Sequence, residues 1–188
     1  MKKLCVITLY MYILLTPLWG QELLQLAEKK LHGIYGENAL LQYEKMPVTM
    51  EMRKDALRAV SQNYYFKYLY YWKVFQNDSL VAHAFVDNVF GKQMPITFLV
   101  VFDDTQKIVY NDILKYREIK GRAVKRREWL DLFLGKNAES GFEYGSEIDA
   151  LSGSTISAKN MTKGVHKLCY LVQKVHDSYI ASKETPKR

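Results

Sequence analysis

The hydroxyl side chains near the C-terminal end of the chain are the residues best suited to chemistry. They lie in the stretch 149–158, around the single Gly153: Ser152, Ser154, Thr155 and Ser157. From Met161 onward apolar residues recur at steps of three and four, which predicts a helix that begins near Thr155. The unpaired N–H groups and positive dipole end of a helix N-terminus attract anions such as phosphate. The stretch therefore predicts a phosphate-binding loop ahead of the last helix.

The same residue types also have a purely structural use. Ser, Thr and Asp are preferred N-caps, and clusters of them mark loops, so Thr155 could act only as a helix cap. No nucleophile elbow, complete phosphate-loop signature or Ser-x-x-Lys motif is present to compete with the stretch. The spacing of these residues alone does not decide between a phosphate site and a plain helix cap.

The stretch resembles the flavinylation motif of the FMN-binding domain family, Asp-x-x-Ser/Thr-Gly-Ala/Ser-Thr-x-Ser. The matching positions are Asp149, Ser152, Gly153, Thr155 and Ser157, with Ser154 where Ala is commoner. In that family FMN is linked through its phosphate to the Thr hydroxyl, which implies that Thr155 carries the cofactor. The resemblance also implies that Asp149 positions the loop or assists the transfer. It places four residues at the phosphate and ribityl chain: Ser152, Gly153, Ser154 and Ile156.

A second resemblance lies earlier in the chain and in the order that the family has. The stretches Gly91–Phe98 and Leu114–Gly121 are similar to the body of exported FMN-binding-domain proteins, and the resemblance covers about residues 64–175. Members from respiratory complexes usually have Glu-Thr-Pro-Gly near Glu118. Here the glutamate and a later glycine are kept and the Thr-Pro pair is absent. The residues implied to lie near the flavin ring are Tyr116, Arg117, Glu118 and Gly121.

The N-terminus is typical of an export signal. Two lysines precede the apolar run Leu4–Trp19, which is shorter than the ~20 residues of a membrane span. We predict a signal peptide over residues 1–20 and a periplasmic or other extracytoplasmic location in a bacterium. Leu18 is larger than the residue expected before a cleavage site, so an uncleaved N-terminal anchor stays open.

The rest of the chain predicts an α+β fold. Residues 21–62 are predicted as a helical extension, residues 63–180 as the FMN-binding domain and residues 181–188 as a polar tail. Within the domain four strands are predicted: 64–74, 80–89, 96–102 and 107–115. Strands followed by helices favour an antiparallel sheet of about four or more strands packed with helices. The flavin-carrying loop is then at the N-terminus of the last helix.

The composition and net charge of the chain limit the classes of binding partner. The net charge is +7, and with 48% hydrophobic and 25% charged residues the chain is not of the disordered class. Export argues against nucleic acid as a partner, whereas a basic surface suits acidic partners or anionic membranes. The basic stretch 120–127 is either a solvated face or a site for phosphate or an acidic partner. Cys169 is predicted as a small buried hydrophobe, His166 as solvent-facing, and no residues have metal-ligand spacing.

These observations predict an exported flavoprotein that carries electrons on covalent FMN. The resemblance implies a separate flavin transferase that uses FAD and magnesium, with this chain as its acceptor and without catalytic residues of its own. It also implies redox protein partners or a membrane electron-transport complex. Two alternatives stay open: an extracytoplasmic binding or structural module of the same fold without flavin, and an enzyme that uses bound flavin to reduce a small substrate.

Overall fold

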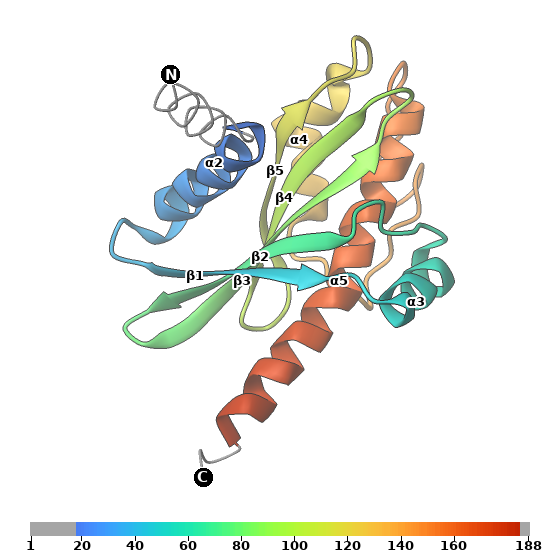
Figure 1. The fold of residues 1–188 in the computed structure, drawn as a ribbon. Coiled ribbons are helices and arrows are strands. Elements are labelled where there is room, and N and C mark those ends of the chain that lie inside the picture. Colours follow the sequence, from blue (N-terminus) through green and yellow to red (C-terminus); the bar gives the residue numbers. More distant parts are fainter. Residues whose placement is uncertain (1–17, 185–188) are drawn as a thin grey trace, which may run out of the picture.

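The fold is built on one antiparallel sheet whose strand order follows the chain, β1-β2-β3-β4-β5 (Figure 1). The computed structural model describes residues 18–184. The N-terminal elements are α2 (Leu18–Tyr35), β1 (Leu40–Pro47) and α3 (Met50–Val60). The meander β2 (Tyr68–Gln76), β3 (Ser79–Phe90), β4 (Pro95–Asp103) and β5 (Ile108–Tyr116) follows. The last elements are η1 (Arg122–Lys125), α4 (Arg127–Leu130), η2 (Asp131–Phe133) and α5 (Thr155–Glu184). The predicted α+β class is confirmed.

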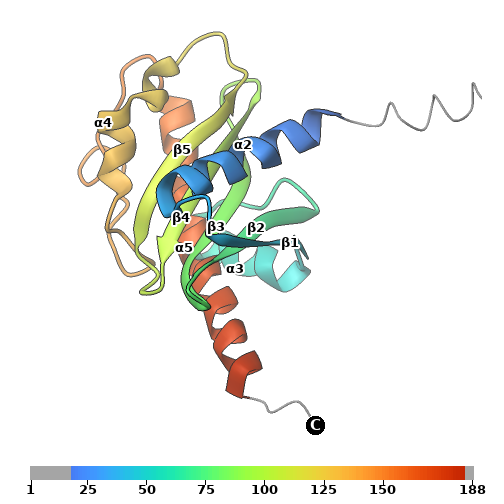
Figure 2. The ribbon, with the colours of Figure 1, turned by 90° about the vertical axis from the view of Figure 1, so that its left-hand side faces the viewer.

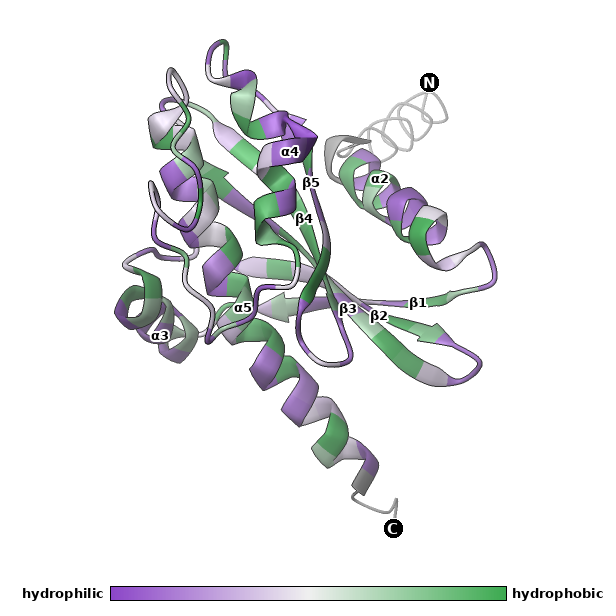
Figure 3. Cartoon of the chain, turned by 180° about the vertical axis from the view of Figure 1, so that it is seen from behind, coloured by the Kyte–Doolittle hydropathy of each residue, from purple (hydrophilic) through white to green (hydrophobic). Residues whose placement is uncertain are grey.

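Helices cover both faces of the sheet. In Figure 2, α2 lies on one side of the strands and α5 on the other. Because side chains alternate along a strand, β4 sends Phe98 and Val100 toward the α5 side and Leu99 and Val101 toward the α2 side. Figure 3 shows β4 mostly in hydrophobic colours, as a strand buried on both faces requires. The two resulting cores fix α5, and with it Thr155, against the sheet.

The N-terminal segment departs from the prediction. Residues 21–62 contain not only helices but also β1, which pairs with β2 and so belongs to the main sheet. The aromatic and lysine alternation of residues 64–74 favours a strand with one buried face, but β2 is buried on both, because α2 covers the second face over Trp72 and Val74. At the other end α5 runs to Glu184 and includes the first part of the predicted tail 181–188.

Most of the predicted signal peptide, residues 1–20, lies outside the described residues, and only its last residues, 18–20, appear, as the start of α2. Among the helices of residues 18–184, none is both long and apolar enough to cross a bilayer.

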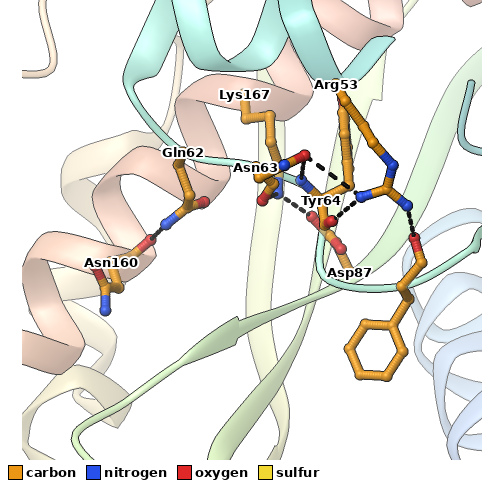
Figure 4. A network of polar contacts seen from close by, with 8 residues as sticks. Arg53, Gln62, Asn63, Tyr64, Asp87, Asn160 and Lys167 are labelled. Carbon is orange, nitrogen blue, oxygen red and sulfur yellow. Dashed lines mark hydrogen bonds and ion pairs between the residues drawn. The ribbon is translucent and has the colours of Figure 1, made fainter. Parts of the chain in front are cut away.

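A buried polar network joins α5 to the sheet and to the segment after α3 (Figure 4). Lys167 of α5 and Asp87 of β3 form an ion pair at 2.9 Å, and each side chain is only 1% exposed. The Lys167 Nζ also donates to the Asn63 carbonyl at 3.3 Å and lies 4.3 Å from the centroid of the Tyr64 ring. Arg53 donates to the Tyr64 carbonyl, so α3 holds the same segment in place.

Candidate functional site

A cavity of about 460 Å³ opens where α5 begins. Its volume is within the range of small-molecule and cofactor sites. Three segments meet there, because the turn between β3 and β4, the end of β5 and the start of α5 share one end of the molecule (Figure 1). The lining residues are Lys92, Gln93, Glu118, Ile119, Lys120, Gly121, Gly153, Ser154, Thr155, Ile156 and Ser157.

Thr155 is the first residue of α5, and its side chain is exposed on the cavity wall. Its Oγ1 makes a long hydrogen bond of 3.4 Å with the Leu151 carbonyl. The preceding turn is closed by the Ser154 N–H, which donates to the same carbonyl at 3.1 Å, and Gly153 adopts a positive φ of 71° within it. A positive φ favours glycine, so this turn explains the glycine of the motif. The first N–H groups of the helix lack intrahelical partners and can bind an anion.

Glu118 fixes the opposite wall of the cavity. Its carboxylate accepts hydrogen bonds from the backbone N–H groups of Gln93 at 2.5 Å and Met94 at 2.9 Å. These bonds lower the pKa of Glu118 below its ordinary value, so the group is ionised at neutral pH. The side chain is 9% exposed and ties the loop after β5 to the turn between β3 and β4. Glu118 thereby positions Lys92 and Gln93 on the cavity.

Gly91 allows this contact, because a Cβ there would lie 2.4 Å from Glu118 Oε1 and 2.8 Å from its Cγ. We expect Gly91→Ala to displace the carboxylate, to cost about 1–3 kcal/mol of stability and to lower FMN incorporation. Urea unfolding and the flavin content of purified protein measure the two effects. The control is Gly33→Ala in α2, where nothing lies within 4 Å, and it should be neutral or stabilising. Equal stability and flavin content in both variants would contradict this role for Gly91.

Tyr116 holds the loop that carries Glu118. Its hydroxyl donates to the Lys120 carbonyl at 2.5 Å, and burial raises the pKa of the phenol above its ordinary value. Gly121 has a φ of 81°, and a Cβ there would lie 2.9 Å from the Tyr116 hydroxyl and 3.4 Å from Ser154 Oγ. Tyr116 is therefore beside the cavity as a support for the loop, and it is not among the lining residues.

Three other predicted site residues do not line the cavity. Arg117 points toward β4, where its Nη1 donates to the Pro95 carbonyl at 3.1 Å and to Thr97 Oγ1 at 2.9 Å. Asp149 lines a separate hollow beside Trp129, whose Nε1 donates to the Asp149 carbonyl at 3.0 Å. Ser152 is exposed in the turn before Thr155 and is absent from the lining. A residue's place in the motif therefore does not by itself put its side chain into the cavity.

Sequence reasoning did not assign four lining residues to the site: Lys92, Gln93, Ile119 and Lys120. Lys92 belongs to the stretch Gly91–Phe98 that resembles the family, and Lys120 belongs to the basic stretch 120–127. These two patterns could have indicated that both lysines belong to the site. Ile119 is 86% exposed and Ile156 is 48% exposed, which gives the cavity mouth two apolar side chains. Two lysines and a helix N-terminus suit a phosphate, while the isoleucines suit an aromatic ring. The residues present thus fit a phosphorylated aromatic cofactor.

Two single-residue predictions outside the cavity had different outcomes. Cys169 is buried and free, as predicted. The prediction that His166 faces solvent is wrong: its ring stacks on Phe142 with centroids 4.1 Å apart. Burial lowers the pKa of His166 below its ordinary value.

Comparison with protein families gives a match of the FMN-binding domain to residues 91–169. A search of the curated proteins found no match. The matched segment begins at Gly91, ends within α5 and contains every residue that lines the cavity. The cofactor that this family indicates is also the one that the cavity fits. Residues 91–169 of the chain thus match the FMN-binding domain, and this domain indicates FMN as the cofactor.

Proposed function

We propose that the chain is an exported electron carrier that holds FMN covalently on Thr155 through a phosphoester bond. The observation that carries this proposal is the exposed Thr155 hydroxyl at the start of α5, on the wall of the cavity in an FMN-binding domain. Ser154 and Ser157 lie beside it and are each 5% exposed. Thr155 is thus the hydroxyl of this cluster that both lines the cavity and is open to a second protein.

The attachment needs a nucleophile, a phosphate site and a leaving group. With FAD as donor, the Thr155 Oγ1 forms the ester bond to the FMN phosphorus, the phosphoanhydride bond breaks and AMP leaves, while the hydroxyl proton passes to solvent. A separate flavin transferase with magnesium provides this catalysis. The helix N-terminus and Lys92 and Lys120 then neutralise the phosphate charge.

The role of the bound group follows from its chemistry. FMN accepts and releases electrons, while the chain binds it, orients it and tunes its potential. The cavity mouth has exposed side chains such as Ile119, which supports exchange with redox protein partners or a membrane electron-transport complex. A covalent link suits a periplasmic protein, because lost FMN could not be replaced there. Residues 1–20 are then the export signal, or an anchor if they are not cleaved.

The test is the intact mass of protein exported from cells that also express a flavin transferase. We expect a mass increase equal to one FMN less one water, and we expect Thr155→Val to lose it completely. Valine keeps the shape of threonine and removes the oxygen. The matched control is Ser152→Ala, which removes a nearby exposed hydroxyl that does not line the cavity and should keep the added mass.

Two results would overturn the covalent link to Thr155. One is an unmodified wild-type chain in cells where the transferase demonstrably flavinylates another acceptor. The other is added mass that persists in Thr155→Val. A folded, exported chain without flavin would instead favour a binding or structural module of the same fold.

A further inference from the structure

Exposed apolar side chains and cations surround the mouth of the FMN cavity, and we call this area the mouth surface. Its apolar members are Tyr65, Phe90, Met94, Ile119 and Ile156. Its cations, all exposed, are Lys92 and Lys120 of the cavity wall and Arg122, which follows Gly121. Within residues 18–184 none of these cations forms an ion pair with a carboxylate. Within the described part of the chain, the positive charges of the mouth surface therefore have no paired negative charge.

Specific contacts make the apolar side chains continuous with the cavity. The rings of Tyr65 and Phe90 meet edge to face with centroids 4.9 Å apart. Asn160, in the first turns of α5, donates to the Phe90 carbonyl at 2.7 Å. Phe90 and Met94 flank the turn that brings Lys92 to the cavity wall. The aromatic side chains and the flavin site thus occupy one surface.

Exposed carboxylates are missing from the segments that form the mouth surface. Residues 61–68, 88–97, 116–127 and 152–167 contain a single acidic residue, Glu118. Its carboxylate already accepts two backbone N–H groups and is nearly buried. Nothing within these segments therefore repels a negatively charged surface.

We propose that the mouth surface binds anionic phospholipid headgroups and places Ile119 at the bilayer interface. Lysines and arginines attract anionic lipids, and aromatic side chains favour the interfacial region. Ile119 is 86% exposed and adjoins Lys120, so it can enter lipid without a complementary pocket on a partner. The inference rests on the proposed function only in that docking would bring the flavin site to the membrane.

The experiment uses the unmodified full chain with an environment-sensitive fluorophore on a cysteine at position 119. The substitutions are Ile119→Cys and Cys5→Ser, and Cys169 is buried and does not compete for the label. Vesicles are phosphatidylcholine alone or an equal mixture with phosphatidylglycerol. We expect a blue shift and a several-fold rise in emission only with the anionic vesicles, weakened by salt. The same label at Leu40→Cys, a 57% exposed position on β1, should not respond.

A charge reversal gives the matched comparison. In the labelled chain K120E/R122E should abolish the response at position 119. K107E/K183E changes the net charge equally at exposed positions in the turn between β4 and β5 and at the end of α5, and it should keep the response. Circular dichroism of both variants, compared with that of the parent chain, is the check that each one folds.

A label at position 119 that stays in water, or responds equally without anionic lipid, would overturn the proposal, as would equal loss in both double variants. An acidic protein would then be the better partner for the mouth surface. Because the chain is unmodified, a failure of flavinylation leaves this result unaffected.

Discussion

Lys167→Met will destabilise the fold by about 3–5 kcal/mol, because it leaves the Asp87 carboxylate buried without its partner. The two side chains are each 1% exposed and form an ion pair at 2.9 Å. The substitution also removes the hydrogen bond to the Asn63 carbonyl and the contact with the Tyr64 ring. Urea unfolding followed by circular dichroism measures the free energy.

Two comparisons isolate the ion pair. Lys163→Met removes an exposed lysine one turn earlier on α5 and should change stability by no more than about 0.5 kcal/mol. The double variant D87N/K167M removes both charges and should recover part of the loss. A Lys167→Met protein as stable as Lys163→Met would show that the carboxylate finds another partner or water.

Trp72→Ala will lower the free energy of unfolding by about 3–5 kcal/mol, because Trp72 is fully buried between the sheet and α2. The substitution will also weaken the packing of α2 on the sheet. The Trp72 Nε1 donates to Glu28 Oε1 of α2 at 3.1 Å, and the Trp72 ring lies 5.3 Å from that of Tyr43 on β1. We expect faster hydrogen exchange in the amides of α2 than in those of α5. Flavin attachment should persist in the folded fraction, because α2 contributes nothing to the cavity lining.

The control for this substitution is Tyr68→Ala, at the exposed start of the same strand, which removes an aromatic ring that is 43% exposed. Tyr68→Ala should lower the free energy of unfolding by much less than Trp72→Ala. Equal losses at Trp72 and Tyr68 would mean that α2 contributes little to the core.

The sequence was most informative where burial and local pattern agree. The apolar run of β4 and the apolar repeat of α5 predicted both elements, since a buried strand and an amphipathic helix leave direct patterns. β1 was not predicted, because an edge strand is mostly exposed and because Glu44 and Lys45 interrupt its apolar pattern. No sequence pattern sets Lys167 apart from the other lysines of α5, because its partner Asp87 lies on a strand far away in the sequence.

The cavity was predictable only in part for a similar reason. The motif residues from Gly153 to Ser157 line it together, because they are neighbours in one turn and its helix. The place of Lys92 depends on Glu118, which holds the turn between β3 and β4 by two backbone hydrogen bonds. Arg117 belongs to the same stretch as Glu118, but its guanidinium contacts Pro95 and Thr97 of β4 and does not line the cavity. Such long-range geometry leaves no spacing signal in the chain.

The 30 residues of α5 have one more consequence. A helix of this length spans about 45 Å, and Figure 1 shows its last turns extending past the sheet, away from the end that holds Thr155. A protein immobilised on an electrode through its C-terminus would therefore keep its cofactor far from the metal and open to partners in solution. Adsorption on a negatively charged electrode through the opposite end would bring the cofactor close enough for direct voltammetry.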